Sequence, residues 1–152
     1  MSAFGIDIDA RCVRIFNEVT SRVQALDQLV DAVASTGAIG DVDSLRTAIL
    51  EREESMSTGI GGGVAIPHVR TKSVARPVLG VGVSKKGVSF NAADNKPVHV
   101  IVLFAMPPDT NKLYLGLLAQ VMVALKAPNF LERLVTCTKP QDVVAVLNES
   151  AG

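Results

Sequence analysis

The sequence has few aromatic side chains and no long apolar run. Phe, Tyr and Trp make up 4% of the 152 residues, whereas 48% are hydrophobic. The core must therefore consist mainly of Val, Leu, Ile and Ala. A chain of this length suits one domain, residues 1–152, that buries roughly 70% of its unfolded surface. The longest apolar stretch, residues 100–106, has the length of a strand and is far below the ~18 residues that span a bilayer.

The sequence also lacks the features of secreted proteins. Its N-terminus has no basic segment followed by an apolar one, so we expect no secretory signal. Cys12 and Cys137 stand far apart and form no C-x-x-C pattern, so no disulfide scaffold is expected. The simplest interpretation is a cytoplasmic protein without membrane insertion.

Neither charge nor motif points to nucleic acid, metal or hydrolysis. Fifteen basic residues balance fifteen acidic ones, whereas nucleic-acid binders usually carry a basic face with stacking aromatics. Cys12, His68, His99 and Cys137 contain no pair with zinc-ligand spacing. No Gly-x-Ser-x-Gly elbow is present either. We therefore expect no nucleic-acid partner and no metal.

Two helices are expected in the first third of the chain. Ser21 and Gln24 form a capping-box pattern, and Gly37 supplies a stop. The expected inner face of this helix repeats at helical spacing: Val23, Leu26, Val30 and Val33. A second helix begins near Asp43 and directs Leu45, Ala48 and Ile49 inward.

Strands and helices then alternate. The expected strands are an edge strand over residues 11–19 and further strands at 64–66, 78–83, 88–90 and 98–106, with a hairpin turn at 85–87. Residues 98–106 are nearly all apolar, as in a central strand covered on both faces. Helices should follow Asp109 or Thr110 and two further capping boxes, at Asn129 with Glu132 and Thr138 with Gln141. This order predicts a single-domain α/β sandwich with a mixed, mostly parallel β-sheet flanked by helices on both faces.

His68 occupies the most constrained backbone position in the chain. It follows a glycine-rich segment, a short apolar run and Pro67, which restricts its own φ and drives Ile66 into an extended conformation. Such a histidine can be a nucleophile, a general base, a metal ligand or a buried hydrogen-bonding group.

Arg52 shares a helical stripe with Leu45, Ala48 and Ile49, so it faces inward rather than into water. A buried guanidinium needs an anion or an acceptor. Arg52 can cap carbonyls, pair with a neighbouring glutamate, or bind an anion near the glycine segment.

The glycine segment of residues 59–63 also has two interpretations. Successive backbone N–H groups can cradle a phosphate, but the segment can equally be a tight turn. It matches neither the Walker loop, which needs Gly-Lys-Ser/Thr, nor the dinucleotide pattern, because Val64 replaces the third glycine.

Tyr114 and His99 are the remaining candidates. Tyr114, the only tyrosine, faces inward in the first turn of its helix; it can pack with its hydroxyl bonded to backbone or donate to an oxyanion. His99 opens an apolar strand and is expected to be a satisfied strand-end residue.

The string STGIGGGVAIPH, residues 57–68, resembles the phosphorylation-site signature of the fructose/mannitol-type EIIA domain. These domains belong to the phosphoenolpyruvate-dependent phosphotransferase system, and the nitrogen-regulatory IIA proteins are close relatives. The resemblance spans essentially the whole chain. It includes Arg52-Glu53, the F-x-A-x-D-x-x-P-V segment at 90–98, and Pro107-Pro108.

The resemblance implies that His68 accepts a phosphoryl group from the carrier HPr and passes it to an EIIB partner or holds it as a signal. Arg52 and the loop would position and neutralise that group without metal or cofactor, as phosphoryl transfer requires. The implied loop residues are Thr58, Gly59, Gly61 and Gly63.

Tyr114 stands where the family commonly has a second histidine. A tyrosine can hydrogen-bond a phosphate but offers no cation near neutral pH, so we expect phosphorylation to persist with altered rate, lifetime or partner choice. Three functions follow: a phosphocarrier transferase component for sugar transport, a nitrogen-type regulator whose phosphorylation controls protein partners, or a degenerate binding domain.

Overall fold

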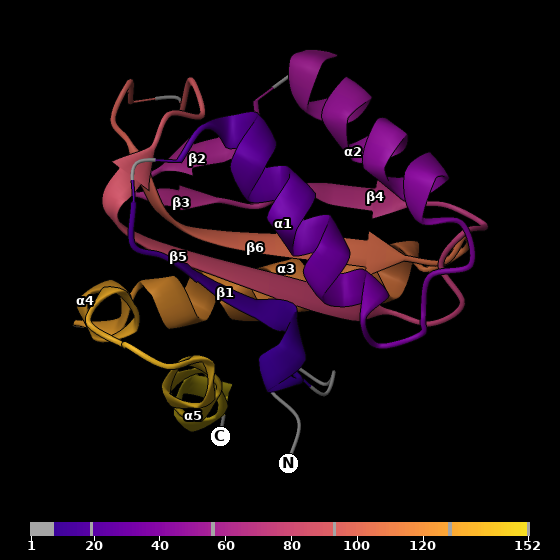
Figure 1. Ribbon diagram of the computed structural model, residues 1–152. Helices are drawn as coiled ribbons and strands as arrows, with labels where there is room; N and C mark the ends of the chain where they lie inside the picture. The colour runs from indigo at the N-terminus through magenta and orange to yellow at the C-terminus, as the bar shows by residue number, and fades with distance from the viewer. Residues whose placement is uncertain (1–7, 19, 56, 93, 128, 152) are drawn as a thin grey trace.

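The computed structural model describes residues 8–18, 20–55, 57–92, 94–127 and 129–151 (Figure 1). The elements are η1 (Ala10–Cys12), β1 (Val13–Phe16), α1 (Arg22–Ala34), α2 (Val42–Ser55), β2 (Gly59–Gly61), β3 (Val64–Ala65), β4 (His68–Arg70), β5 (Val78–Val88), β6 (Val98–Met106), α3 (Asn111–Leu125), α4 (Phe130–Val135) and α5 (Pro140–Ala151). The described strands form one sheet of six in the order β1-β5-β6-β3-β2, and β4 also pairs with β6, beyond the end of β3.

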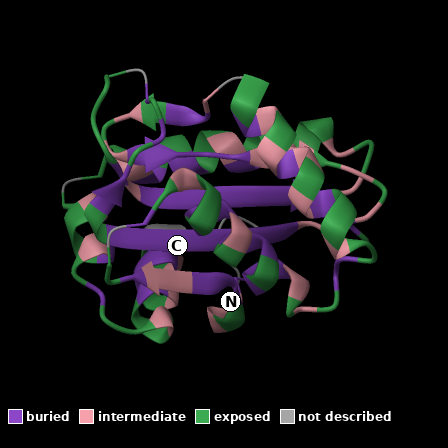
Figure 2. Ribbon diagram, turned by 45° about the horizontal axis from the view of Figure 1, so that its top comes forward, coloured by how far each residue is buried: buried purple, intermediate pink, exposed green. Residues whose placement is uncertain are grey.

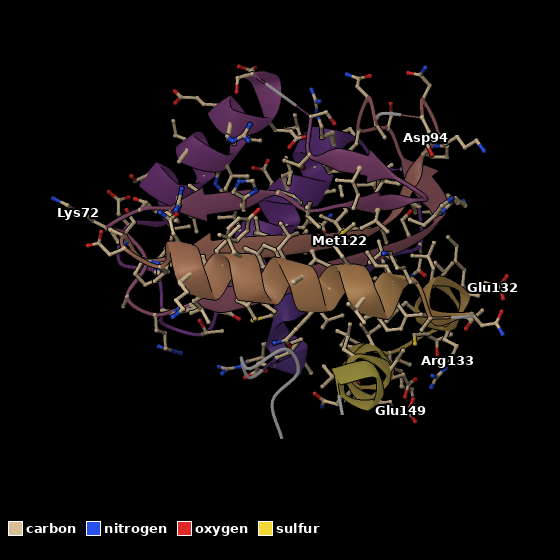
Figure 3. All side chains as sticks on the ribbon, turned by 180° about the vertical axis from the view of Figure 1, so that it is seen from behind. Lys72, Asp94, Met122, Glu132, Arg133 and Glu149 are labelled. Atoms are coloured by element: carbon tan, nitrogen blue, oxygen red, sulfur yellow. The ribbon has the colours of Figure 1, made fainter. Side chains whose placement is uncertain are left out.

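The sheet is mixed and lies between two layers of helices. Among the described strands, β1–β5, β3–β6 and β4–β6 pair in parallel, whereas β5–β6 and β2–β3 are antiparallel. Helices α1 and α2 cover one face, and α3, α4 and α5 lie on the other (Figures 1 and 3). The predicted α/β sandwich with a mostly parallel mixed sheet is confirmed.

Strand β6 divides the core into two layers, because successive side chains of a strand point to opposite faces. The residues that pack with α3 and α5 are Val100, Val102, Phe104 and Met106. Those that pack with α1 are Ile101, Leu103 and Ala105. All are buried, and Figure 2 shows the inner strands in the colour of buried residues. The prediction of a central strand covered on both faces is therefore confirmed.

The predicted strands at 78–83 and 88–90, with a hairpin turn at 85–87 between them, are wrong: one strand, β5, spans Val78–Val88. Strand β5 is continuous, and residues 85–87 lie within a bulge where the register with β6 shifts. Gly87 has φ +89°, and its N–H donates to the hydroxyl of Ser84 (2.9 Å). The connection to β6 is instead residues 89–97. A Lys-Lys-Gly break is compatible with a bulge or a turn, and only pairing with β6 selects the bulge.

Local helix signals had mixed outcomes. The capping box of Ser21 and Gln24 is confirmed, but Val23 is 51% exposed, so its inward placement was wrong. Asn129 adopts φ +63° and makes no capping hydrogen bond to α4, which contradicts the predicted capping box. Helix α5 begins at Pro140 rather than directly after Thr138.

The predicted edge strand over residues 11–19 is confirmed only as the shorter β1, which does lie at the sheet edge. The residues before it form a 3-10 turn, and Val19 lies outside the described residues. None of the described helices combines the length and apolar character that crossing a bilayer requires.

Candidate functional site

Backbone hydrogen bonds fix the chain immediately before His68. The N–H of Ile66 donates to the carbonyl of Thr58 (3.0 Å), and the N–H of Phe104 donates to the carbonyl of Pro67 (2.9 Å). His68 itself opens β4 and pairs with Phe104. Its side chain is half-buried. The ring therefore lies at a strand end, neither enclosed in the core nor free in solvent.

The contacts of the imidazole determine which nitrogen is available for chemistry. Nδ1 of His68 lies 3.3 Å from the carbonyl oxygen of Ile66. A carbonyl oxygen only accepts hydrogen bonds, so in the neutral ring we assign the proton to Nδ1 and the lone pair to Nε2. The local backbone conformation before His68 thus supplies the acceptor that sets the tautomer, which the sequence did not identify.

Burial lowers the pKa of His68 below its ordinary value. The carbonyl of Ile66 opposes this shift, while the positive charges of Arg52 and Arg70 reinforce it and Glu53 weakly opposes it. The ring is therefore kept neutral near pH 7, and a neutral imidazole is the nucleophilic form.

Tyr114 lies against the face of His68. The two ring centroids are 4.8 Å apart, and the planes are inclined by 28°. Phe104 supports the tyrosine edge-on, at 5.5 Å and 77°. Burial raises the pKa of Tyr114, so its hydroxyl stays protonated near neutral pH and can donate a hydrogen bond. The inward placement predicted for Tyr114 is confirmed, and its neighbour is the histidine.

Arg52 lies in the last turn of α2, a helix beside β4 (Figure 1). Its side chain is half-buried and makes no hydrogen bond or ion pair with the described residues. Arg52 therefore neither caps carbonyls nor pairs with the adjacent Glu53. Its charge affects the pKa of both His68 and Tyr114. The guanidinium is therefore available to bind an anion near these two rings.

Glu53 holds the segment that leads to His68. It is 3% exposed, and its carboxyl oxygens accept from the Thr58 N–H (3.0 Å) and the Thr58 hydroxyl (2.8 Å). Arg22 lies 4.0 Å from the same carboxyl group. The N–H and the hydroxyl of Thr58 thus both donate to Glu53. This predicted binding residue therefore stabilises the backbone before His68.

The glycine segment lies away from the imidazole. Val64 pairs with Val100 and His68 with Phe104, so about four residues, or roughly 13 Å of strand, separate them along β6. The N–H of Gly62 donates to Asp94 Oδ2 (3.1 Å).

Each of the three predicted glycines also has a local structural role. Gly59 packs against Ala92, and Gly61 and Gly63 adopt positive φ. The structure does not bring Gly61 or Gly63 together with His68; Gly59–Gly61 form β2, and residues 62–63 form the tight turn into β3.

His99 is a satisfied strand residue, in line with its expected role. Its Nδ1 lies 2.8 Å from the carbonyl of Ser84, at the β5 bulge. Within the described part of the chain, no group of three or more His, Cys, Asp or Glu residues is placed to hold a metal ion.

Two residues of the site were not identified from the sequence. Phe104 supports Tyr114, and Arg70 acts electrostatically on both rings. The available signal was the two-residue period of a strand, which places Arg70 on the same face of β4 as His68.

Comparison with known proteins shows one consistent family. Residues 8–150 match the model described as phosphoenolpyruvate-dependent sugar phosphotransferase system, EIIA 2. A fructose-specific EIIA component of Haloferax volcanii is 31% identical over 125 residues, which cover 82% of this chain and 81% of that protein. A fructose-specific EIIABC component of Bacillus subtilis is 28% identical over 137 residues; the match covers 90% of this chain but only 22% of that larger protein.

Solved structures show the same fold. Nitrogen regulatory protein IIA-Ntr from Neisseria meningitidis superposes with a TM-score of 0.81 at 23% identity, covering 92% of this chain and 95% of that one. The Escherichia coli complex of enzyme IIA-Mtl and phosphorylated enzyme IIB-Mtl gives 0.78 at 16% identity, covering 93% and 97%.

Proposed function

We propose that this chain, which belongs to the phosphoenolpyruvate-dependent sugar phosphotransferase system EIIA 2 family, is a cytoplasmic phosphocarrier phosphorylated on His68. The donor is phosphorylated HPr, and the recipient is an EIIB partner. The observation that carries the proposal is a neutral imidazole whose Nε2 has no hydrogen-bond partner among the described residues, and whose pKa is lowered by the charge of the nearby Arg52.

The transfer forms one N–P bond and breaks another. The lone pair on Nε2 of His68 attacks phosphorus while the N–P bond of the donor phosphohistidine breaks, and that bonding pair returns to the donor ring nitrogen. The proton on Nδ1 stays in place, held by the Ile66 carbonyl, so the phosphorylated ring carries a positive charge beside the phosphoryl dianion. Positioning and charge neutralisation are the main requirements of such a reaction.

The surrounding residues support these requirements. Tyr114 restricts the ring from one face, and Arg52 offers a charge that no neighbouring side chain in the described structure neutralises. The Glu53–Thr58 contacts hold the backbone that presents the histidine. Release to EIIB is the same reaction in reverse, with the partner's nucleophile attacking phosphorus.

Labelling tests the phosphorylation. The protein is incubated with phosphoenolpyruvate, enzyme I and HPr, and intact mass is followed for an acid-labile, base-stable phosphate. We expect label on the wild type and on His99→Gln, and none on His68→Ala. An unlabelled wild type would instead favour a domain kept only for binding.

A regulatory role of the nitrogen type is the second candidate, and Tyr114 favours it. The ring stacked on His68 is a tyrosine rather than a second imidazole, so it cannot supply a positive charge to the phosphoryl group as that group moves between proteins. A slowly discharged phosphohistidine suits a signal that controls protein partners.

Adding candidate EIIB proteins to the labelled protein separates the two roles. Discharge within the time of labelling supports the carrier. Retention of label with every EIIB, together with a protein partner that binds only one phosphorylation state, supports the regulator.

A further inference from the structure

Two arginines differ from all the others in having no partner among the described residues. Six of the eight form hydrogen bonds or ion pairs there: Arg11, Arg14, Arg22, Arg46, Arg76 and Arg133. The side chains of Arg52 and Arg70 have no such contact with any described residue. Guanidinium groups carry five donors and normally use them. Both unpaired groups belong to elements that meet at His68.

Strand β4 places Arg70 on the same face as the histidine. His68 pairs with Phe104 and Arg70 with Met106, and both partners pack on the α3 side of the sheet. Side chains two residues apart in a strand point the same way. Arg70 is exposed at the end of β4, whereas Arg52 is half-buried in the last turn of α2. The two guanidinium groups thus belong to different elements, Arg52 to α2 and Arg70 to β4.

The fields of both arginines act on the same two rings. Burial is the largest cause of the lowered pKa of His68, and each arginine lowers that pKa further. Burial raises the pKa of Tyr114, and each arginine partly offsets this rise. A phosphoryl group on Nε2 presents three oxygens that share up to two negative charges, so a single guanidinium leaves acceptor sites that a second can bind. Tyr114 can donate one hydrogen bond there but supplies no charge.

We propose that Arg70 is the second phosphate-binding cation of this site and acts with Arg52 on the phosphoryl group carried by His68. This inference rests on the proposed phosphorylation of His68. In this proposal a residue of β4, Arg70, supplies the positive charge that Tyr114, in the first turn of α3, does not provide. The fork of the guanidinium suits two phosphoryl oxygens, so lysine is expected to replace it only in part.

Arg70 has a matched control on the same stretch of chain. Lys72 follows β4 and points outward from the molecule (Figure 3). Lys72→Gln changes the net charge by the same amount as Arg70→Gln but does not alter the charge at the two rings. Arg70→Lys retains the charge and loses the fork.

A small phosphoryl donor separates phosphate binding from partner docking. Potassium phosphoramidate transfers its phosphoryl group to histidine as its own N–P bond breaks and its nitrogen leaves as ammonia. We expect Arg70→Gln to slow this labelling about tenfold or more, the loss of one charge-assisted hydrogen bond. Arg70→Lys should lie between Arg70→Gln and the wild type, and Lys72→Gln should match the wild type.

A titration of the phosphorylated proteins followed by ³¹P NMR provides a readout that a structural role would not change. A nearby cation favours the dianion, so the second phosphoryl pKa should be higher in Arg70→Gln than in the wild type or Lys72→Gln. Equal labelling rates and equal phosphoryl pKa values in the wild type and Arg70→Gln would overturn the proposal. Slower labelling by phosphorylated HPr alone, with phosphoramidate kinetics unchanged, would overturn it in favour of a partner contact.

Failure of the proposed function has a different signature. If His68 is not the acceptor, His68→Ala carries as much label as the wild type, or neither protein is labelled, whichever donor is used. If only the role of Arg70 is wrong, wild-type labelling on His68 is intact and Arg70→Gln behaves like it.

Discussion

The phenol ring of Tyr114 lies over the imidazole of His68, with centroids 4.8 Å apart and an angle of 28° between the planes. The tyrosine comes from the first turn of α3 and the histidine from the start of β4, so the contact joins a helix to the sheet. It shields one face of the imidazole and contributes to the burial that disfavours the charged form.

Removing that cover should raise the pKa of His68. In Tyr114→Ala the ring gains solvent, and we expect its pKa to move toward the ordinary value of about 6.5. Tyr114→Phe keeps the stacked ring and should leave the pKa near that of the wild type. An NMR titration of the imidazole resonances measures both; an unchanged value in Tyr114→Ala would show that other neighbours account for the burial.

Folding stability should fall as the solution is made acidic, in part through His68. The unfolded ring titrates at about 6.5, and the folded ring at a lower pKa, so the unfolded state binds more protons between those two values. The contribution is complete above about pH 6.5 and is lost as pH falls through the folded pKa.

Urea unfolding of the wild type and His68→Gln, from about pH 7.5 to about pH 5, measures this difference. We expect the wild type to lose more unfolding free energy than the variant over that range. Parallel curves for the two proteins would contradict a lowered pKa.

Arg52→Gln should slow phosphorylation of His68 about tenfold without lowering the melting temperature. The guanidinium has no partner in the described structure, so its loss removes a charge beside the phosphoryl group but no native contact. Arg46→Gln is the matched control on the same helix, because Arg46 is paired with Asp27 and Asp31. Labelling kinetics and thermal unfolding of the two variants are compared; an unchanged labelling rate for Arg52→Gln would remove Arg52 from the site.

Glu53→Ala should destabilise the protein by about 2–3 kcal/mol, because it leaves the N–H and hydroxyl of Thr58 without their buried acceptor. Thr58→Ala should cost less, since the N–H remains. The two effects should be clearly less than additive in the double variant, as expected for residues that share contacts. Urea midpoints and slopes provide the cycle, and strict additivity would be inconsistent with the direct pairing.

Gly59→Ala should be destabilising by about 1–3 kcal/mol, since its Cβ would lie 2.8 Å from the Cβ of Ala92 and 3.0 Å from its Cα. Gly116→Ala is the opposite case. Gly116 lies in α3, and beyond the backbone of its own helix no described heavy atom comes within 4 Å of the place that an alanine methyl would take. Alanine should therefore stabilise by about 0.5–1 kcal/mol. Melting temperatures that shift in the same direction for both variants would contradict the close packing of Gly59 against Ala92.

Local sequence was sufficient for features that depend on a few neighbouring residues. The capping box of Ser21 and Gln24 satisfies backbone groups within one turn, and the apolar run 98–106 encodes a strand covered on both faces. Pro67 constrains the backbone before His68 wherever the strand is placed. The family signature at 57–68 and the candidate pair His68 and Arg52 were visible for the same reason.

Features that depend on distant pairing were decided in three dimensions. Residues 85–87 became a bulge because β5 continues along β6, and α1 turned Val23 outward because Ala25 and Leu29 complete its buried face. Pairing of β3 and β4 with successive parts of β6 separated the glycine turn from His68 and brought the histidine to Phe104 and Tyr114. That pairing register cannot be predicted from neighbouring residues alone, because it depends on the packing of side chains far apart in the chain.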